Sequence, residues 1–241
     1  MNKREAKEFI QKYLTDFLEK HGFTEKKRRD NEVTFRRKTK DGFDGIGLGT
    51  VSYTPVQIIQ YSVYKQIDSV ENIMADIGNK LGDRKSFPDM KELYTVAFGY
   101  EGYHGMVTKS RYLPEMQNEA EAKVAVDMII DFMQKDAIPQ LDKFNDLREI
   151  DKIINGDDFW ITDWQKPFNL GGGNFCAKRL VVAKLAGNPK YDEVVRKNYE
   201  GLREFLRGVG NQKELDELNE SDLSQPIPFA VEYLKNVESM Y

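Results

Sequence analysis

Apolar residues in the first twenty positions recur at the spacing of an α-helix. They fall three or four residues apart and form one stripe along a helix over 3–21: Ala6, Phe9, Ile10, Tyr13, Leu14, Phe17 and Leu18. Gly22 follows the stripe, and glycine suits the left-handed conformation with which many helices end. The pattern therefore predicts an N-terminal amphipathic helix that buries one face.

After Gly22 the helical spacing ends and an extended stretch begins. Val33 and Phe35 alternate with polar residues, and 56–66 is rich in Ile, Tyr and Val, features that are typical of β-strands. Asp30-Asn31 is the predicted turn between the first two strands, and Lys40-Asp41-Gly42 and Thr54-Pro55 precede the next two. The predicted strands cover 24–29, 32–38, 43–53, 56–66 and 93–100.

The third predicted strand contains Gly45-Ile46-Gly47-Leu48-Gly49, in which glycine occupies every second position. Ile46 and Leu48 then face a core, and the opposite face carries no side chains at these positions. A bare face allows a helix, another strand or a ligand to approach closely. A nucleotide-binding loop is disfavoured, because such loops need a different glycine spacing between a strand and a helix.

Helical spacing returns after the fourth strand. Helices are predicted over 68–79 and 118–137, and an apolar stripe continues from Pro139 to Asn155-Gly156. From residue 174 onward the patterns are helical. We therefore expect an α+β fold with an antiparallel sheet of about four or five strands packed with helices, followed by an all-helical C-terminal region. The expected divisions are an α+β domain over 1–155, an aromatic-rich connector over 156–173 and a helical extension over 174–241.

Composition narrows the class of protein. The chain has 241 residues, of which 40% are hydrophobic, so it can bury a substantial core. No apolar run approaches the roughly 18 residues that span a bilayer, and the first residues lack the apolar segment of a signal peptide. The single cysteine excludes an internal disulfide. These features predict a cytoplasmic protein with no membrane association.

Positive charge is concentrated near the start of the chain. Residues 1–40 hold 13 Lys or Arg and 7 Asp or Glu, a balance of +6, whereas the whole chain carries −4, so the remainder carries −10. Lys26–Arg29 and Arg36–Lys38 fall on the two arms of the predicted hairpin. Opposed across it, they would form a cationic patch, in which Arg36 and Arg37 are candidate binding residues for an acidic protein surface. A nucleic-acid role is not favoured, because the rest of the chain is acidic.

No motif in the chain specifies a reaction. Glu101, Tyr103 and His104 place a carboxylate, a phenol and an imidazole at a predicted strand end, and they form the best general acid–base set in the sequence. They would support a hydrolase or a transferase, although an exposed loop is the preferred interpretation. His21 and His104 are too far apart to indicate a histidine-based metal site, and no metal or cofactor is expected.

A glycine run precedes the first helix of the C-terminal region. Free amide groups at a helix start attract anions, so Gly172, Lys178 and Arg179 form a candidate anion or nucleotide site. A hinge followed by an ordinary helix cap is the favoured alternative. Cys176 lies in the same helix and is expected to be a buried structural cysteine, because no histidine lies near it in sequence to act as a base.

Both tryptophans of the chain, Trp160 and Trp164, fall in the connector. Tryptophan is enriched at binding hot spots, so the two are candidate contact residues for a partner. It serves equally well to attach one part of a chain to another, and that interpretation is favoured for an apolar connector of this length.

Some domains share a plan in which a leading helix ends in Gly-Phe, strands with an aromatic-Arg step follow, and a long helix closes the unit. In this chain the matching residues are Gly22-Phe23, Phe35-Arg36-Arg37 and the strand from Val56 to Lys65. In this respect the first 155 residues resemble bacterial domains of unknown function, some of which are linked to toxin–immunity systems. The resemblance implies an immunity-like or regulatory role and assigns no functional residue. The overall expectation is a non-catalytic module that binds a protein partner, and the sequence does not indicate an oligomeric state.

Overall fold

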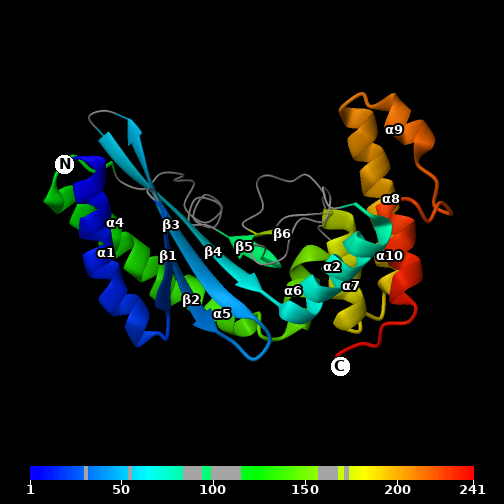
Figure 1. Ribbon diagram of the computed structural model, residues 1–241, viewed down its shortest axis with the longest axis horizontal. Helices are drawn as coiled ribbons and strands as arrows, with labels where there is room; N and C mark the ends of the chain where they lie inside the picture. Colours follow the sequence, from blue (N-terminus) through cyan, green and yellow to red (C-terminus); the bar gives the residue numbers. More distant parts are fainter. Residues whose placement is uncertain (30–31, 54–55, 84–93, 99–114, 157–167, 171–173) are drawn as a thin grey trace. The chain divides into compact units, whose positions relative to one another are not determined.

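The computed structural model describes residues 1–29, 32–53, 56–83, 94–98, 115–156, 168–170 and 174–241. Within these residues the chain forms a sheet with the strand order β1-β2-β3-β4-β5-β6, and the C-terminal region is mostly helical (Figure 1). The predicted α+β fold class is confirmed. None of the described helices combines the length and the apolar character needed to cross a bilayer.

Two compact units make up the chain, and each is assembled from separate segments. Unit 1 comprises Met1–Gln66, Ala97–Asn145 and Gln165–Asn169. Unit 2 comprises Ile67–Val96, Asp146–Trp164 and Leu170–Tyr241. Each unit is described by itself below.

Helix α1 (Lys3–Lys20) opens unit 1 as the apolar stripe predicts. The side chain of Asn2 accepts hydrogen bonds from the first free amides, and Glu5 bonds back to the amide of Asn2, which completes a capping box. The buried residues of the helix are Ala6, Ile10, Leu14 and Leu18. Gly22 takes a positive φ of 81° directly after the helix, as expected.

The four long strands have the predicted bounds. They are β1 (Thr24–Arg29), β2 (Glu32–Lys38), β3 (Phe43–Tyr53) and β4 (Val56–Gln66), and each pairs with the next in antiparallel fashion. Two short strands, β5 (Val96–Phe98) and β6 (Phe168–Leu170), complete the sheet. β5 lies inside the fifth predicted strand, whereas β6 was not predicted, because three residues are too few to show an alternation.

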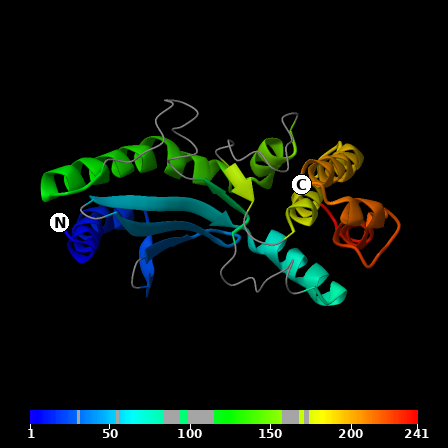
Figure 2. The ribbon, with the colours of Figure 1, turned by 90° about the horizontal axis from the view of Figure 1, so that it is seen from above.

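One face of the sheet carries the apolar core of unit 1. The register aligns Val33 with Leu48 and Leu48 with Tyr61, so these residues share a face. Helix α1 covers this face and leaves a small cavity against Val33 and Leu48. Helix α4 (Glu119–Phe132) covers it too, since Phe132 lies with its ring centroid 5.7 Å from that of Tyr61. Figure 2 shows α4 running along one side of the sheet.

The opposite face of β3 is filled at Gly45 by a side chain of the neighbouring strand. Gly45 pairs with Tyr64, and a Cβ atom placed on the glycine would lie 2.1 Å from the phenol ring. Phe43 meets the same ring edge-on, at a centroid distance of 6.1 Å. At this position, the absence of a side chain makes room for Tyr64.

Replacing Gly45 by alanine is expected to lower the free energy of unfolding by about 1–3 kcal/mol, because the ring of Tyr64 must leave its place. Chemical denaturation would measure this. Gly208 is the matched control: it lies in a helix with open space around it, so alanine there is expected to be neutral or stabilising. In a Tyr64→Ala background the cost at residue 45 should largely disappear; an undiminished cost would show that another contact sets it.

The helical segment after α4 contains a π-helical turn. One helix was predicted over 118–137, but α4 ends at Phe132 and the π-helical segment η2 (Met133–Ala137) follows it. Helix α5 (Ile138–Lys143) continues directly from it, with Pro139 in its first turn. This arrangement brings Leu141 and Asp142 beside the strands.

Unit 2 is built around helix α7 (Phe175–Leu185), which is buried on almost all sides. Four helices pack against it: α2 (Asp68–Leu81), α6 (Leu147–Ile154), α8 (Tyr191–Gly208) and α10 (Pro226–Leu234). The short helix α9 (Gln212–Glu217) packs against α8. Asn174 caps α7 by accepting a hydrogen bond from the amide of Ala177, as its sequence position predicts.

Candidate functional site on the central sheet

Arg36 and Arg37 are consecutive residues of β2, so their side chains point to opposite faces of the sheet. Both were candidate binding residues in the sequence. The structure gives them different environments, and the difference separates a structural residue from a candidate functional one.

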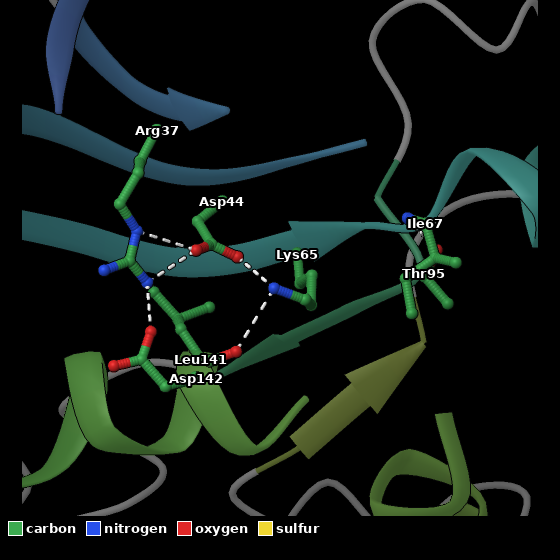
Figure 3. Close-up of polar contacts among 7 residues, drawn as sticks. All are labelled: Arg37, Asp44, Lys65, Ile67, Thr95, Leu141 and Asp142. Atoms are coloured by element: carbon green, nitrogen blue, oxygen red, sulfur yellow. Dashed lines mark hydrogen bonds and ion pairs between the residues drawn. The ribbon is translucent and has the colours of Figure 1, made fainter. Parts of the chain in front are cut away.

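Arg37 lies on the core face and is fully engaged by carboxylates (Figure 3). Its Nε and Nη2 atoms donate to Oδ2 of Asp44 at 2.9 and 2.7 Å. The Nη2 atom also donates to Oδ1 of Asp142 on α5 at 2.7 Å. Both donors converge on one oxygen of Asp44, which leaves Oδ1 of the carboxylate for a second cation.

Lys65 of β4 completes the cluster. Its ammonium donates to the other oxygen of Asp44 and to the carbonyl oxygen of Leu141, the latter at 3.2 Å. Asp44 is completely buried and Lys65 is 1% exposed. Burial lowers the pKa of Lys65, and the charge of Asp44 opposes that change. Arg37, Asp44, Lys65 and Asp142 carry two positive and two negative charges, so the cluster is balanced and ties three strands to α5.

Arg36 lies on the other face and stacks on an aromatic side chain. Its guanidinium carbon is 4.1 Å from the ring centroid of Phe43, a cation–π geometry. The register places Arg36 beside Gly45 and Tyr64, and Lys38 beside Phe43. We call Arg36, Lys38, Phe43 and Tyr64 the Arg36 platform.

The cations of the Arg36 platform have no carboxylate partner among the residues that the structure describes. The Nε atom of Arg36 is buried and makes no hydrogen bond there. Lys38 is exposed. A buried N–H group without an acceptor lowers the stability of the folded protein. The positive charge of the platform therefore favours a bound anion over the unoccupied state.

The two basic runs of the hairpin do not face each other, so that prediction is wrong. Arg36 pairs with Thr24, whereas Arg28 pairs with Val33 and Arg29 with Glu32. Only two residues separate β1 from β2 in the sequence, and a short connection fixes the register. In this register Lys27, Arg28 and Arg29 of β1 lie opposite residues Thr34, Val33 and Glu32 of β2. The basic residues therefore lie at different ends of the hairpin.

Lys178 and Arg179 lie in the interior of unit 2. Lys178 is 1% exposed, and its ammonium is 3.0 Å from Oε1 of Glu71 and donates to the carbonyl oxygen of Tyr94 at 3.1 Å. Thr95 donates from its hydroxyl to the same carboxylate at 2.7 Å and accepts from the amide of Ile67 at 2.9 Å. Burial lowers the pKa of Lys178 and lowers that of Arg179 to about 10. Both side chains serve the packing of α7.

A second buried polar cluster links α6 to the turn before α8. Asp151 accepts hydrogen bonds from the side-chain amides of Asn155 at 2.8 Å and Asn188 at 2.7 Å. Burial raises the pKa of Asp151, and these two hydrogen bonds oppose the rise. The amide of Asn155 also donates to the carbonyl oxygen of Arg179 at 3.1 Å. The cluster holds two helices together and presents no group to solvent for chemistry.

Cys176 is buried, as the sequence predicts, and burial raises the pKa of its thiol to about 11. Because the thiolate is the reactive form, the folded protein is expected not to react with a disulfide-exchange reagent at about pH 8. One thiol per chain should react once the protein is unfolded in guanidinium. Rapid stoichiometric labelling of the folded protein would contradict this placement.

Several candidate residues lie outside the described part of the chain. They are Glu101, Tyr103, His104, Trp160, Trp164 and Gly172. Within the described residues, no group of three or more His, Cys, Asp or Glu side chains is arranged to hold a metal ion.

The sequence contains a signal for the buried cluster of unit 1. Asp44 and Lys65 sit at inward positions of their strands, two residues from the buried Ile46 and Val63. Charged residues at such positions are expected to find partners of opposite charge. Glu71 and Lys178 carried no comparable signal, because they come from different helices far apart in the chain.

No protein-family model and no curated protein matches the sequence, and no solved structure matches the fold.

Proposed function

We propose that this protein is a non-catalytic module of the bacterial cytoplasm that binds another protein, in an immunity-like or regulatory role. The observation that carries the proposal is the contrast between the two neighbouring arginines. Arg37 is paired with carboxylates inside the unit, whereas Arg36 lies over the ring of Phe43 with no carboxylate of the described chain beside it.

The environment of the other reactive groups supports a binding role. Lys65 and Lys178 are buried beside carboxylates, and the thiol of Cys176 is buried with a raised pKa. A general base or nucleophile must reach a substrate, and these three groups are closed off by their own contacts. What unit 1 presents on the Arg36 platform is a cation framed by aromatic rings, a combination enriched at protein interfaces.

The test is the isolation of a partner followed by reconstitution from purified components. The full chain, immobilised, should retain a protein from host extract that then forms a stoichiometric complex with it in gel filtration and a measurable dissociation constant in calorimetry. The control variant Arg4→Gln removes one positive charge from an exposed side chain of α1, and it should bind the partner as tightly as the wild-type protein does. Failure to reconstitute any complex, together with turnover of a substrate by the purified chain, would overturn the proposal.

A further inference from the structure

The Arg36 platform has the geometry of a carboxylate receptor. The guanidinium of Arg36 lies over the ring of Phe43, and the edge-on contact of Phe43 with Tyr64 supports that ring. A guanidinium whose orientation is already fixed loses little entropy when it binds a planar carboxylate through two hydrogen bonds. The Nε atom of Arg36 is itself buried and has no acceptor in the described chain, so a carboxylate of a partner would meet the terminal Nη groups of the same guanidinium, and the Nε–H group would report that contact.

Lys38 extends the receptor along the strand. It lies two residues from Arg36 and therefore on the same face, at a spacing of about 6.6–6.8 Å along β2. Alternate residues of an extended segment have the same spacing. Two acidic side chains separated by one residue in such a segment would face Arg36 and Lys38 together.

Exposed polar residues border the platform. Thr24, Lys38 and Ser62 are exposed on the strands that flank Arg36 and Gly45. The described helices α1 and α4 contact the other face of the sheet. An extended segment could thus lie across the platform without displacing either helix.

We propose that the Arg36 platform binds an acidic, extended segment of the partner protein, with one carboxylate on Arg36 and a second on Lys38. This inference rests on the proposed function and specifies the chemistry of the partner. A nucleic acid fits less well, because the platform supplies two cations while the chain beyond residue 40 carries a balance of −10.

Nuclear magnetic resonance of the ¹⁵N-labelled full chain tests this directly, because the side-chain Nε–H group of arginine gives its own signal. The probe is a synthetic octapeptide in which Glu alternates with Thr, and its control has Gln in place of Glu. We expect the Glu peptide to shift the Nε–H signal of Arg36 and to leave that of Arg37 unchanged, since Arg37 already donates to Asp44. Arg36→Gln should weaken the peptide about tenfold or more, and Arg4→Gln should leave it unchanged.

Two outcomes would overturn the inference. One is no shift of the Arg36 signal with the Glu peptide. The other is an equal shift with inorganic phosphate or a single-stranded oligonucleotide, which would make the platform a general anion site. The proposed function is judged separately: a partner that binds wild-type and Arg36→Gln proteins equally would leave the binding role standing and remove the platform from it.

Discussion

Replacing Asp44 by asparagine is expected to lower the free energy of unfolding by about 3–5 kcal/mol, the range for removing one member of a buried ion pair. The substitution keeps the shape of the side chain and removes its charge. Lys65, which is 1% exposed, then loses the carboxylate that it bonds directly, and Asp142 is the carboxylate that remains on Arg37 among the described residues. Urea denaturation followed by circular dichroism would measure the loss.

The control for this prediction is Asp142→Asn. Asp142 pairs with the same guanidinium, but its side chain is 56% exposed, so solvent screens the pair and the expected loss is below about 1 kcal/mol. Adding Lys65→Met to Asp44→Asn should recover much of the stability, because the buried ammonium disappears with its partner. Equal losses for Asp44→Asn and Asp142→Asn would show that burial does not govern this cluster.

The sequence predicted the local elements of the fold well. Seven apolar residues at helical spacing located α1. Alternation located β2 and β3, and the turn residues between the strands set the bounds of β1 and β4. These elements are determined by residues close together in the chain, so a linear pattern contains the information. Gly45 shows the limit of that pattern: the alternation revealed an empty place on one face but not that Tyr64 fills it.

The candidate site depended on information that a linear pattern lacks. The period of two places Arg36 and Arg37 on opposite faces, but only the register of β2 with β3 shows that Asp44 lies beside one of them and Phe43 near the other. The segments of the two compact units also alternate along the chain. Pairings of this kind are set by tertiary packing, which composition and spacing do not record.

Unit 2 provides the second large expected effect, at the buried pair of Glu71 and Lys178. Glu71→Gln removes the carboxylate 3.0 Å from the ammonium of Lys178, and both side chains are at most 2% exposed. The loss should again be about 3–5 kcal/mol at neutral pH. Replacing both residues with apolar ones of similar size, Glu71→Leu with Lys178→Met, should cost much less, because no charge remains in the interior.

The pH dependence of the Glu71→Gln variant gives this prediction its sharpest form. Burial already lowers the pKa of Lys178, and losing the nearby carboxylate should lower it further. The unfolded chain then binds more protons than the folded one in the alkaline range, so the free energy of unfolding must rise with pH there. Urea melts between about pH 6 and pH 9 should therefore show the deficit of the variant shrinking once Lys178 is neutral in the folded variant, and the shrinkage should end where Lys178 is neutral in the folded wild-type protein as well. Glu193→Gln, which breaks a partly exposed pair with Lys197 on α8, should cost below about 1 kcal/mol with no such trend. A deficit of Glu71→Gln that stays constant with pH would mean that the cost comes from lost packing or hydrogen bonds and not from the buried charge.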